Sequence, residues 1–270
     1  MNELFPERIV CLTEESTETL YLLGEEHRIV GISGFTVRPP RARREKPKVS
    51  AFTSAKIDKI LALKPDLAIG FSDLQADIAA SLIRAGVEVW VSNHRSVEGI
   101  LGYILRLGAM VGAAAKAEAL IARLQSRLQR IAEWAQALPR RPRVYFEEWD
   151  EPLIAGIRWV SELIELAGGI EVFPELRHAS LARERILADP SEVIRRAPDI
   201  VFASWCGKKF RPERLAARPG WDAIPAVRNG ALHEIPSPLI LQPGPAALTD
   251  GLDRIVQHIA AWAGVPVPVE

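Results

Sequence analysis

The stretch that decides the fold is Lys56–Ile69, which reads KIDKILALKPDLAI. A short amphipathic pattern ends before Pro65, Asp66 follows, and an apolar run comes next. Proline disfavours helical geometry in the residue before it, and aspartate favours a turn. The stretch therefore predicts a helix over Ile57–Leu63, a turn, and a buried strand over Leu67–Phe71.

The same pattern returns late in the chain at Pro190–Phe202, which reads PSEVIRRAPDIVF. It predicts a helix over Ser191–Arg196 and a strand over Ile200–Ala203. Between the two copies, Ala113–Leu138 contains no glycine or proline and repeats apolar residues at helical spacing. Two copies on either side of one long helix indicate two similar lobes.

The remaining segments continue the alternation of strand and helix, which is typical of α/β proteins with parallel sheets. We expect helix Thr13–Gly24, with Leu20, Leu22 and Leu23 facing a sheet, and a closing helix over Leu248–Ala263. Strands are predicted over Arg8–Leu12, Arg28–Ile32, Val87–Val91, Val144–Glu147 and Ala231–Ile235. Helices are predicted over Ile78–Ala85 and Trp159–Ala167. The prediction is an α/β protein of two Rossmann-like lobes with central parallel sheets, residues 1–112 and 140–270, joined by one interdomain helix over 113–139.

Charge and motifs disfavour several classes of protein. Lys plus Arg and Asp plus Glu both number 34, so the basic excess typical of nucleic-acid binders is missing. There is no GxSxG, GxGxxG, Walker A or zinc motif. We therefore expect no catalytic site and no resident metal. Two cysteines, Cys11 and Cys206, are expected to be small buried thiols.

The order of several motifs resembles that of the class III periplasmic binding proteins, which bind vitamin B12, ferric siderophores or haem. The similarity covers nearly the whole chain, and the vitamin B12 binders are the most similar members. The matching pieces are Arg8–Val10, Glu15–Gly24, Arg28–Gly31, both Pro-Asp units, Glu162–Gly169, Trp221–Gly230 and Pro243–Pro245. The resemblance implies that two lobes hold a ligand in the cleft between them.

Aromatic residues at strand ends are the main candidates for ligand contact, because open α/β sheets bind ligands at the carboxyl ends of their strands. Large aromatics also suit the flat ring of a corrin or porphyrin. For each one, packing in the core is the competing interpretation. The candidates are Phe35, Phe52 and Phe71 in the first lobe and Trp149, Trp159 and Trp205 in the second, with Ser16 and Gln242 as polar contacts. Gln242 stands where a vitamin B12 binder carries an arginine.

The resemblance implies a corrinoid ligand, cobalamin or cobinamide, bound without catalysis. A ferric siderophore or haem is the alternative, and an enzyme acting on a bound tetrapyrrole is the alternative of another class. A histidine ligand to the bound metal stays open, with His94 and His178 as candidates. The basic stretch Arg38–Lys48 is a solvated loop or a rim that attracts an anionic group.

The resemblance also implies a partner, the permease of an ABC importer. Asp58 and Glu192 begin the two paired helices and match the acidic residues that dock on permease arginines; stabilising the helix dipole is the competing role. We expect a monomer. No secretory signal precedes Arg8, which predicts a cytoplasmic carrier, or a periplasmic protein if an upstream signal is missing.

Overall fold

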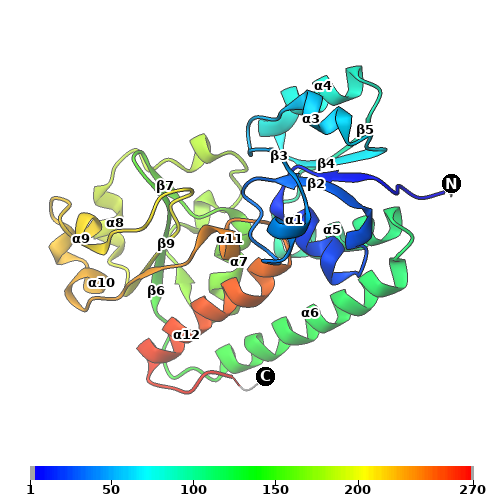
Figure 1. Ribbon diagram of the computed structural model, residues 1–270. Coiled ribbons are helices and arrows are strands. Elements are labelled where there is room, and N and C mark those ends of the chain that lie inside the picture. The colour runs from blue at the N-terminus through cyan, green and yellow to red at the C-terminus, as the bar shows by residue number, and fades with distance from the viewer. Residues whose placement is uncertain (1–3, 269–270) are drawn as a thin grey trace. The chain divides into compact units, whose positions relative to one another are not determined.

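Strand β1, Ile9–Cys11, stands at the centre of the first of two five-stranded sheets in the computed structural model, which describes residues 4–268. The first sheet has the order β3-β2-β1-β4-β5, and all of its neighbours are parallel. The other strands are β2 (Ile29–Ser33), β3 (Lys48–Ser50), β4 (Leu67–Phe71) and β5 (Glu88–Ser92). The helices are α1 (Glu14–Leu22), α2 (Ala42–Glu45), α3 (Ile57–Ala62), α4 (Ala76–Arg84) and α5 (Val97–Met110) (Figure 1).

Helices cover both faces of this sheet because its strands are apolar on both sides. Ile9 and Cys11 point to one face, into a cluster with residues of α1 and α5. Val10 and Leu12 point to the other face, into a cluster with residues of α3 and α4. The predicted α/β lobe with a central parallel sheet is confirmed for this part of the chain.

The second sheet has the order β10-β9-β6-β7, with β8 also paired to β6. It is parallel except for β7, which forms an antiparallel pair with β6. Its strands are β6 (Arg143–Asp150), β7 (Leu153–Ala155), β8 (Ile170–Glu171), β9 (Ile200–Ala203) and β10 (Leu232–Glu234). The helices are α7 (Arg158–Leu166), α8 (Ser191–Arg196), α9 (Pro212–Ala216), α10 (Pro225–Arg228), α11 (Ser237–Ile240) and α12 (Leu252–Ala263) (Figure 1).

The contacts divide the chain into two compact units, each built around one sheet. Unit 1 contains the chain up to His94 together with Glu98–Arg123 and Gly244–Ala246, and unit 2 contains the remainder. The predicted long helix is present as α6, Ala114–Gln136. The division falls inside α6, whereas the sequence-based division treats the helix as a separate connector over 113–139. Along residues 4–268, no helix is both long enough and apolar enough to cross a bilayer.

Four expectations differ from the structure. Leu22 is exposed, because only Leu20 and Leu23 share the buried face of α1. Cys206 is exposed in the turn after β9, so only Cys11 is a buried thiol. No element is predicted over residues 97–110, where α5 lies, and the same is true of β3, β7, β8, α2, α9, α10 and α11. The closing helix begins with a π-helical turn over Ala247–Gly251 before α12.

The Pro-Asp unit of unit 1 holds the start of the neighbouring strand. The Asp66 carboxylate accepts the backbone N–H groups of Glu7, at 2.7 Å, and Arg8, at 3.0 Å. Arg8 returns the contact, because its Nε donates to the carbonyl of Lys64 at 2.9 Å. Lys64, just before the proline, has a positive φ of 48°.

Unit 2 repeats these contacts. The Asp199 carboxylate accepts the backbone N–H of Arg143 at 2.8 Å, and Arg143 Nε donates to the carbonyl of Arg196 at 2.8 Å. Ala197, before the second proline, also has a positive φ, of 41°. The aspartate therefore does more than turn the chain: in each unit it fixes the central strand to the end of the preceding helix.

We expect Asp66→Asn to lower the free energy of unfolding by about 1.5 kcal/mol, because an amide group accepts these N–H groups less strongly than a carboxylate. Urea denaturation measures the change. Asp77→Asn, at an exposed position in α4 of the same unit, is the control and should change stability little. Equal stability of the two variants would contradict the role given to Asp66.

Candidate functional site

The carboxyl edge of the unit 1 sheet contains the point where the strand order reverses. The chain runs from β1 to β2 and β3 on one side, and then to β4 and β5 on the other. Such a reversal, between β1 and β4, is where open α/β sheets bind ligands. The residues at this edge are those that follow β1, β2, β3 and β4: Thr13, Phe35, Phe52 and Ser72.

Two large apolar side chains are exposed at this edge. Phe35 follows β2 and is 54% exposed, and Leu74 follows β4 and is 59% exposed. Phe52, after β3, is half-buried. Apolar side chains of this size at the carboxyl edge of a sheet offer a surface for an apolar ligand.

Gln75 joins the ends of β1, β3 and β4 at this edge, and it is not among the residues that the sequence predicts for the site. Its Nε2 donates to the carbonyls of Phe52, at 2.8 Å, and Leu12, at 3.3 Å. Its Oε1 accepts the backbone N–H of Phe71 at 2.9 Å. A buried amide that joins three strand ends holds the loops that carry Phe52 and Leu74 in place. Its burial, not its local sequence, shows this role.

Two of the predicted contacts in unit 1 lie in the interior. The ring of Phe71 meets His94 edge-on, with 5.4 Å between centroids, and His94 stacks on Tyr103. The Ser16 hydroxyl donates to the carbonyl of Thr13 at 2.9 Å. Burial favours packing for both, and their contact with a ligand stays a prediction.

The end of β6 in unit 2 carries three carboxylates, and each has a cation of its own. Glu147 is paired with Arg218, Glu148 with Arg185 and Asp150 with Lys208. Arg185 is buried and Arg218 is largely so. These three carboxylates are therefore neutralised by residues far away along the chain. No local sequence pattern predicts these partners, because each carboxylate and its cation are 37 to 71 residues apart in the chain.

Aromatic residues surround Lys208 at the same end of the unit 2 sheet. Its Nζ lies 4.8 Å from the ring centroid of Trp149 and 5.0 Å from that of Trp205. Trp149 is half-buried, and its indole N–H donates to the carbonyl of Glu151 at 2.8 Å. This places Trp149 and Lys208 where β6 and β9 end.

The other predicted residues of unit 2 are less open. Trp205 is buried against Phe210, and its indole N–H donates to Glu147 at 3.0 Å. Trp159 is buried at the start of α7 and donates to the carbonyl of Ile240 at 2.8 Å. Gln242 is half-buried. Packing explains the two tryptophans, and the ligand role of all three residues stays a prediction.

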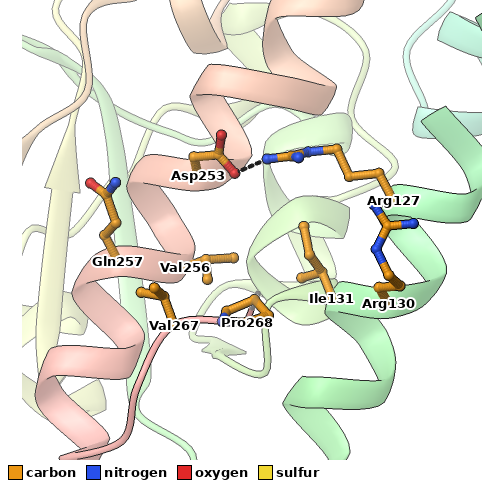
Figure 2. A pocket seen from close by; sticks show the side chains of 8 residues that line it. All are labelled: Arg127, Arg130, Ile131, Asp253, Val256, Gln257, Val267 and Pro268. Carbon is orange, nitrogen blue, oxygen red and sulfur yellow. Dashed lines mark hydrogen bonds and ion pairs between the residues drawn. The ribbon is translucent and has the colours of Figure 1, made fainter. Parts of the chain in front are cut away.

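Unit 2 also contains a pocket that none of the predicted residues lines. It lies between α6 and α12 and is closed by Val267 and Pro268 (Figure 2). An ion pair between Arg127 and Asp253 crosses it. Its other lining residues are Arg130, Ile131, Val256 and Gln257. The pocket is remote in sequence from the strand ends, and its ion pair joins the two helices.

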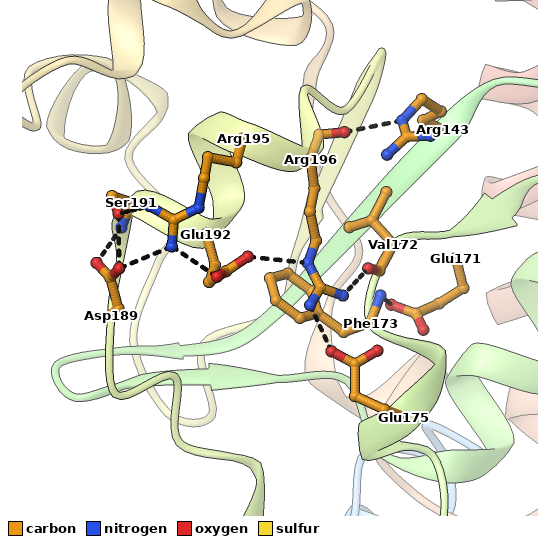
Figure 3. Close-up of polar contacts among 10 residues, drawn as sticks. All are labelled: Arg143, Glu171, Val172, Phe173, Glu175, Asp189, Ser191, Glu192, Arg195 and Arg196. Atoms are coloured by element: carbon orange, nitrogen blue, oxygen red, sulfur yellow. Dashed lines mark hydrogen bonds and ion pairs between the residues drawn. The ribbon is translucent and has the colours of Figure 1, made fainter.

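The two acidic docking candidates differ in their surroundings. Asp58 is exposed at the start of α3. Glu192 accepts from Arg195 at 2.6 Å and from Arg196 at 3.4 Å, and Arg195 also binds Asp189 (Figure 3). Hydrogen bonding from Arg195 lowers the pKa of Glu192. A partner arginine would have to compete with these contacts, and the docking role of both carboxylates stays a prediction.

Three of the six basic residues in the stretch Arg38–Lys48 make contacts within unit 1. Arg38 binds Glu18, Arg41 binds Glu26, and Arg43 donates to the carbonyls of Gly34 and Thr36. These contacts leave fewer of its cations for an anionic ligand than the sequence suggests. Among residues 4–268, no three His, Cys, Asp or Glu side chains gather in a way that could hold a metal ion.

The fold and the order of its motifs define a class of protein. The family model described as periplasmic binding protein matches residues 9–239, and the chain belongs to this family. A heme binding protein from Pseudomonas aeruginosa has the same fold, with a TM-score of 0.83 at 23% identity over 98% of this chain and 96% of that one.

Individual relatives carry names that refer to cobalamin. The vitamin B12-binding protein of Vibrio parahaemolyticus is 26% identical over 93% of this chain and 89% of its own length. The cobalamin-binding protein of Halobacterium salinarum is 26% identical over 70% of this chain. The chain matches about half of the length of the Halobacterium protein, 53%.

Proposed function

We propose that the chain binds a corrinoid, cobalamin or cobinamide, and presents it to the permease of an ABC importer. The observation that carries the proposal is the exposure of two large apolar side chains, Phe35 and Leu74, at the carboxyl edge of the unit 1 sheet, which contains the strand-order reversal. Covering such a surface with a flat macrocycle is favourable by about 25 cal/mol for each Å² of apolar area. Binding is proposed without a chemical step.

Two further observations support this ligand class. Trp149 and Lys208 at the end of the unit 2 sheet offer an aromatic face beside a cation. The relatives named for vitamin B12 and cobalamin are similar along most of this chain. Haem is the second candidate, because a haem binder shares the fold. Delivery to an importer places the proposed site of action outside the cytoplasmic membrane, and the cytoplasmic carrier stays the alternative prediction.

Tryptophan fluorescence tests the proposal. Adding cyanocobalamin or cyanocobinamide should quench the emission saturably, because the corrin absorbs where indole emits and Trp149 lies at a strand end. Phe35→Ala should weaken binding by about 1.5–3 kcal/mol, the value of burying one large apolar side chain. Thermal stability should change little, because the side chain is already exposed.

Ile83→Ala is the matched control, since Ile83 is an exposed apolar residue of the same unit, 60% exposed, on α4. Its affinity should equal that of the parent chain. Saturable binding of hemin or a ferric siderophore, without response to either corrinoid, would replace the ligand and keep the class of protein. Equal loss in both variants would remove Phe35 from the site.

A further inference from the structure

The pocket between α6 and α12 is lined in large part by apolar side chains. Ile131 of α6 and Val256 of α12 are both buried, and Val267 and Pro268 close one side (Figure 2). The cavity has a volume of about 170 Å³. An apolar cavity of about 150 Å³ inside a protein is large enough to bind benzene. The pocket therefore has room for an apolar group the size of one ring.

The segment that closes the pocket is held in place by hydrogen bonds. The backbone N–H of Val265 donates to the carbonyl of Ala260 at 3.0 Å, which turns the chain back after α12. The indole N–H of Trp134, in α6, donates to the carbonyl of Pro266 at 3.0 Å. The prolines on either side of Val267 restrict its backbone further. This wall exists before a ligand arrives, so binding does not have to order it, which lowers the cost of association.

The polar side chains that line the pocket differ in what they already bind. Arg127 and Asp253 form an ion pair, so their charges offset each other. The guanidinium of Arg130 donates to the Ser126 hydroxyl at 2.9 Å, and within residues 4–268 it pairs with no carboxylate. The side-chain amide of Gln257 has no hydrogen-bond partner in that range either. Among the lining residues, Arg130 therefore supplies one uncompensated positive charge.

The single charge lies at one side of the apolar lining. Figure 2 shows Arg130 and Gln257 on opposite sides of the apolar side chains, so the charged group and the uncharged amide are separated. A carboxylate accepts well from a guanidinium, because both partners of that hydrogen bond are charged. An apolar body attached to the carboxylate can cover Ile131 and Val256, which is favourable by about 25 cal/mol for each Å² removed from water. An ammonium group would be repelled by Arg130.

We propose that the pocket between α6 and α12 binds a small monocarboxylate with an apolar group of about one ring, such as an aromatic or branched aliphatic acid. Two independent features support this ligand class: the preformed apolar cavity and the single uncompensated cation beside it. A second carboxylate on the ligand would meet only the uncharged amide of Gln257. The inference goes beyond corrinoid binding and does not depend on it.

Benzoate, benzamide and acetate separate charge from apolar contact, because benzamide lacks the charge of benzoate and acetate lacks its ring. The indole N–H peak of Trp134 in a proton–nitrogen NMR correlation spectrum reports on the pocket wall, and its loss in Trp134→Phe assigns it. At constant ionic strength, benzoate should shift this peak saturably, with a dissociation constant on the order of 1 mM. Benzamide should bind about three to five times more weakly, and acetate about ten times more weakly.

Substituting the cation tests its role. In Arg130→Gln, benzoate and benzamide should bind within about twofold of each other, because the charge that distinguishes them is gone. Arg123→Gln removes another exposed arginine of α6, outside the pocket, and should keep the preference of the parent chain. If benzoate causes no saturable shift of the Trp134 peak in the parent chain, the site is overturned. Equal binding of benzoate and benzamide by the parent chain, or an unchanged preference in Arg130→Gln, overturns the carboxylate as its ligand.

Discussion

Replacing Arg218 by methionine is expected to lower the free energy of unfolding by about 3–5 kcal/mol, the cost of leaving one charge of a buried pair without its partner. Glu147 has no exposed surface and accepts both ends of the guanidinium, at 2.6 Å and 2.9 Å. Burial raises the pKa of Glu147, and Arg218 counteracts that effect. Without Arg218, the carboxylate must stay charged at a high cost or take up a proton.

Protonation of Glu147 should make the stability of the Arg218→Met variant depend on pH. The single variant should recover part of its stability at pH 5 relative to pH 8, because a protonated Glu147 no longer carries a buried charge. Urea denaturation at both pH values measures this. Arg218→Met combined with Glu147→Leu should be less destabilised than Arg218→Met alone, and Arg214→Met, at an exposed arginine of α9, should be near the parent chain. Equal loss in the single and double variants would show that the charge of Glu147 is unimportant.

The stability of the parent chain is expected to fall as the pH rises from 6.5 to 8. Burial raises the pKa of Glu14 from 4.5 to about 8 and that of Glu15 from 4.5 to about 7. In unit 2, burial also raises the pKa of Glu171 from 4.5 to about 7. Between the unfolded and folded pKa values, the folded state holds more protons than the unfolded state. Stability is therefore present at low pH and is lost as the pH passes the folded values.

The histidines affect the pH dependence of stability mainly below pH 6.5. Burial lowers the pKa of His258 from 6.5 to about 4, and that of His233 is lowered too. This makes stability rise with pH below 6.5 and partly cancels the effect of the carboxylates there. Above pH 6.5, the carboxylates with raised pKa values dominate the pH dependence of stability.

Glutamine at positions 14 and 15 should flatten the slope. One pKa unit corresponds to about 1.4 kcal/mol, so the parent chain should lose on the order of 2 kcal/mol across the window. The variant with both substitutions should lose less than half of this free energy across the window. Glu88→Gln, at an exposed glutamate of β5, is the control and should behave like the parent chain. Urea unfolding at pH 6.5, 7.2 and 8.0 gives the three slopes. A parent chain with a flat profile would contradict the shifted pKa values.

Local pattern was sufficient for most of the secondary structure. Strands β4 and β9 and helix α8 have the predicted bounds, because apolar runs beside a Pro-Asp turn leave few alternatives. The sequence pattern does not predict helix α5, because Gly99, Gly102 and Gly108 lower its helix propensity. The tertiary structure explains one of them: a Cβ at Gly108 would lie 2.3 Å from that of Ala117 in α6, so the glycine allows the two helices to approach closely.

The sequence by itself determined the alternation of strands and helices, the repeated Pro-Asp units and the edge of the sheet where Phe35 and Phe52 lie, because each depends on neighbours within a few residues. Only the tertiary structure decided which charges and aromatics are paired. Arg218 meets Glu147 across 71 residues, Ala246 meets Glu18 across 228, and Trp159 meets Ile240 across 81. Burial and ion pairing arise from contacts between distant segments, and no local pattern in one sequence records them.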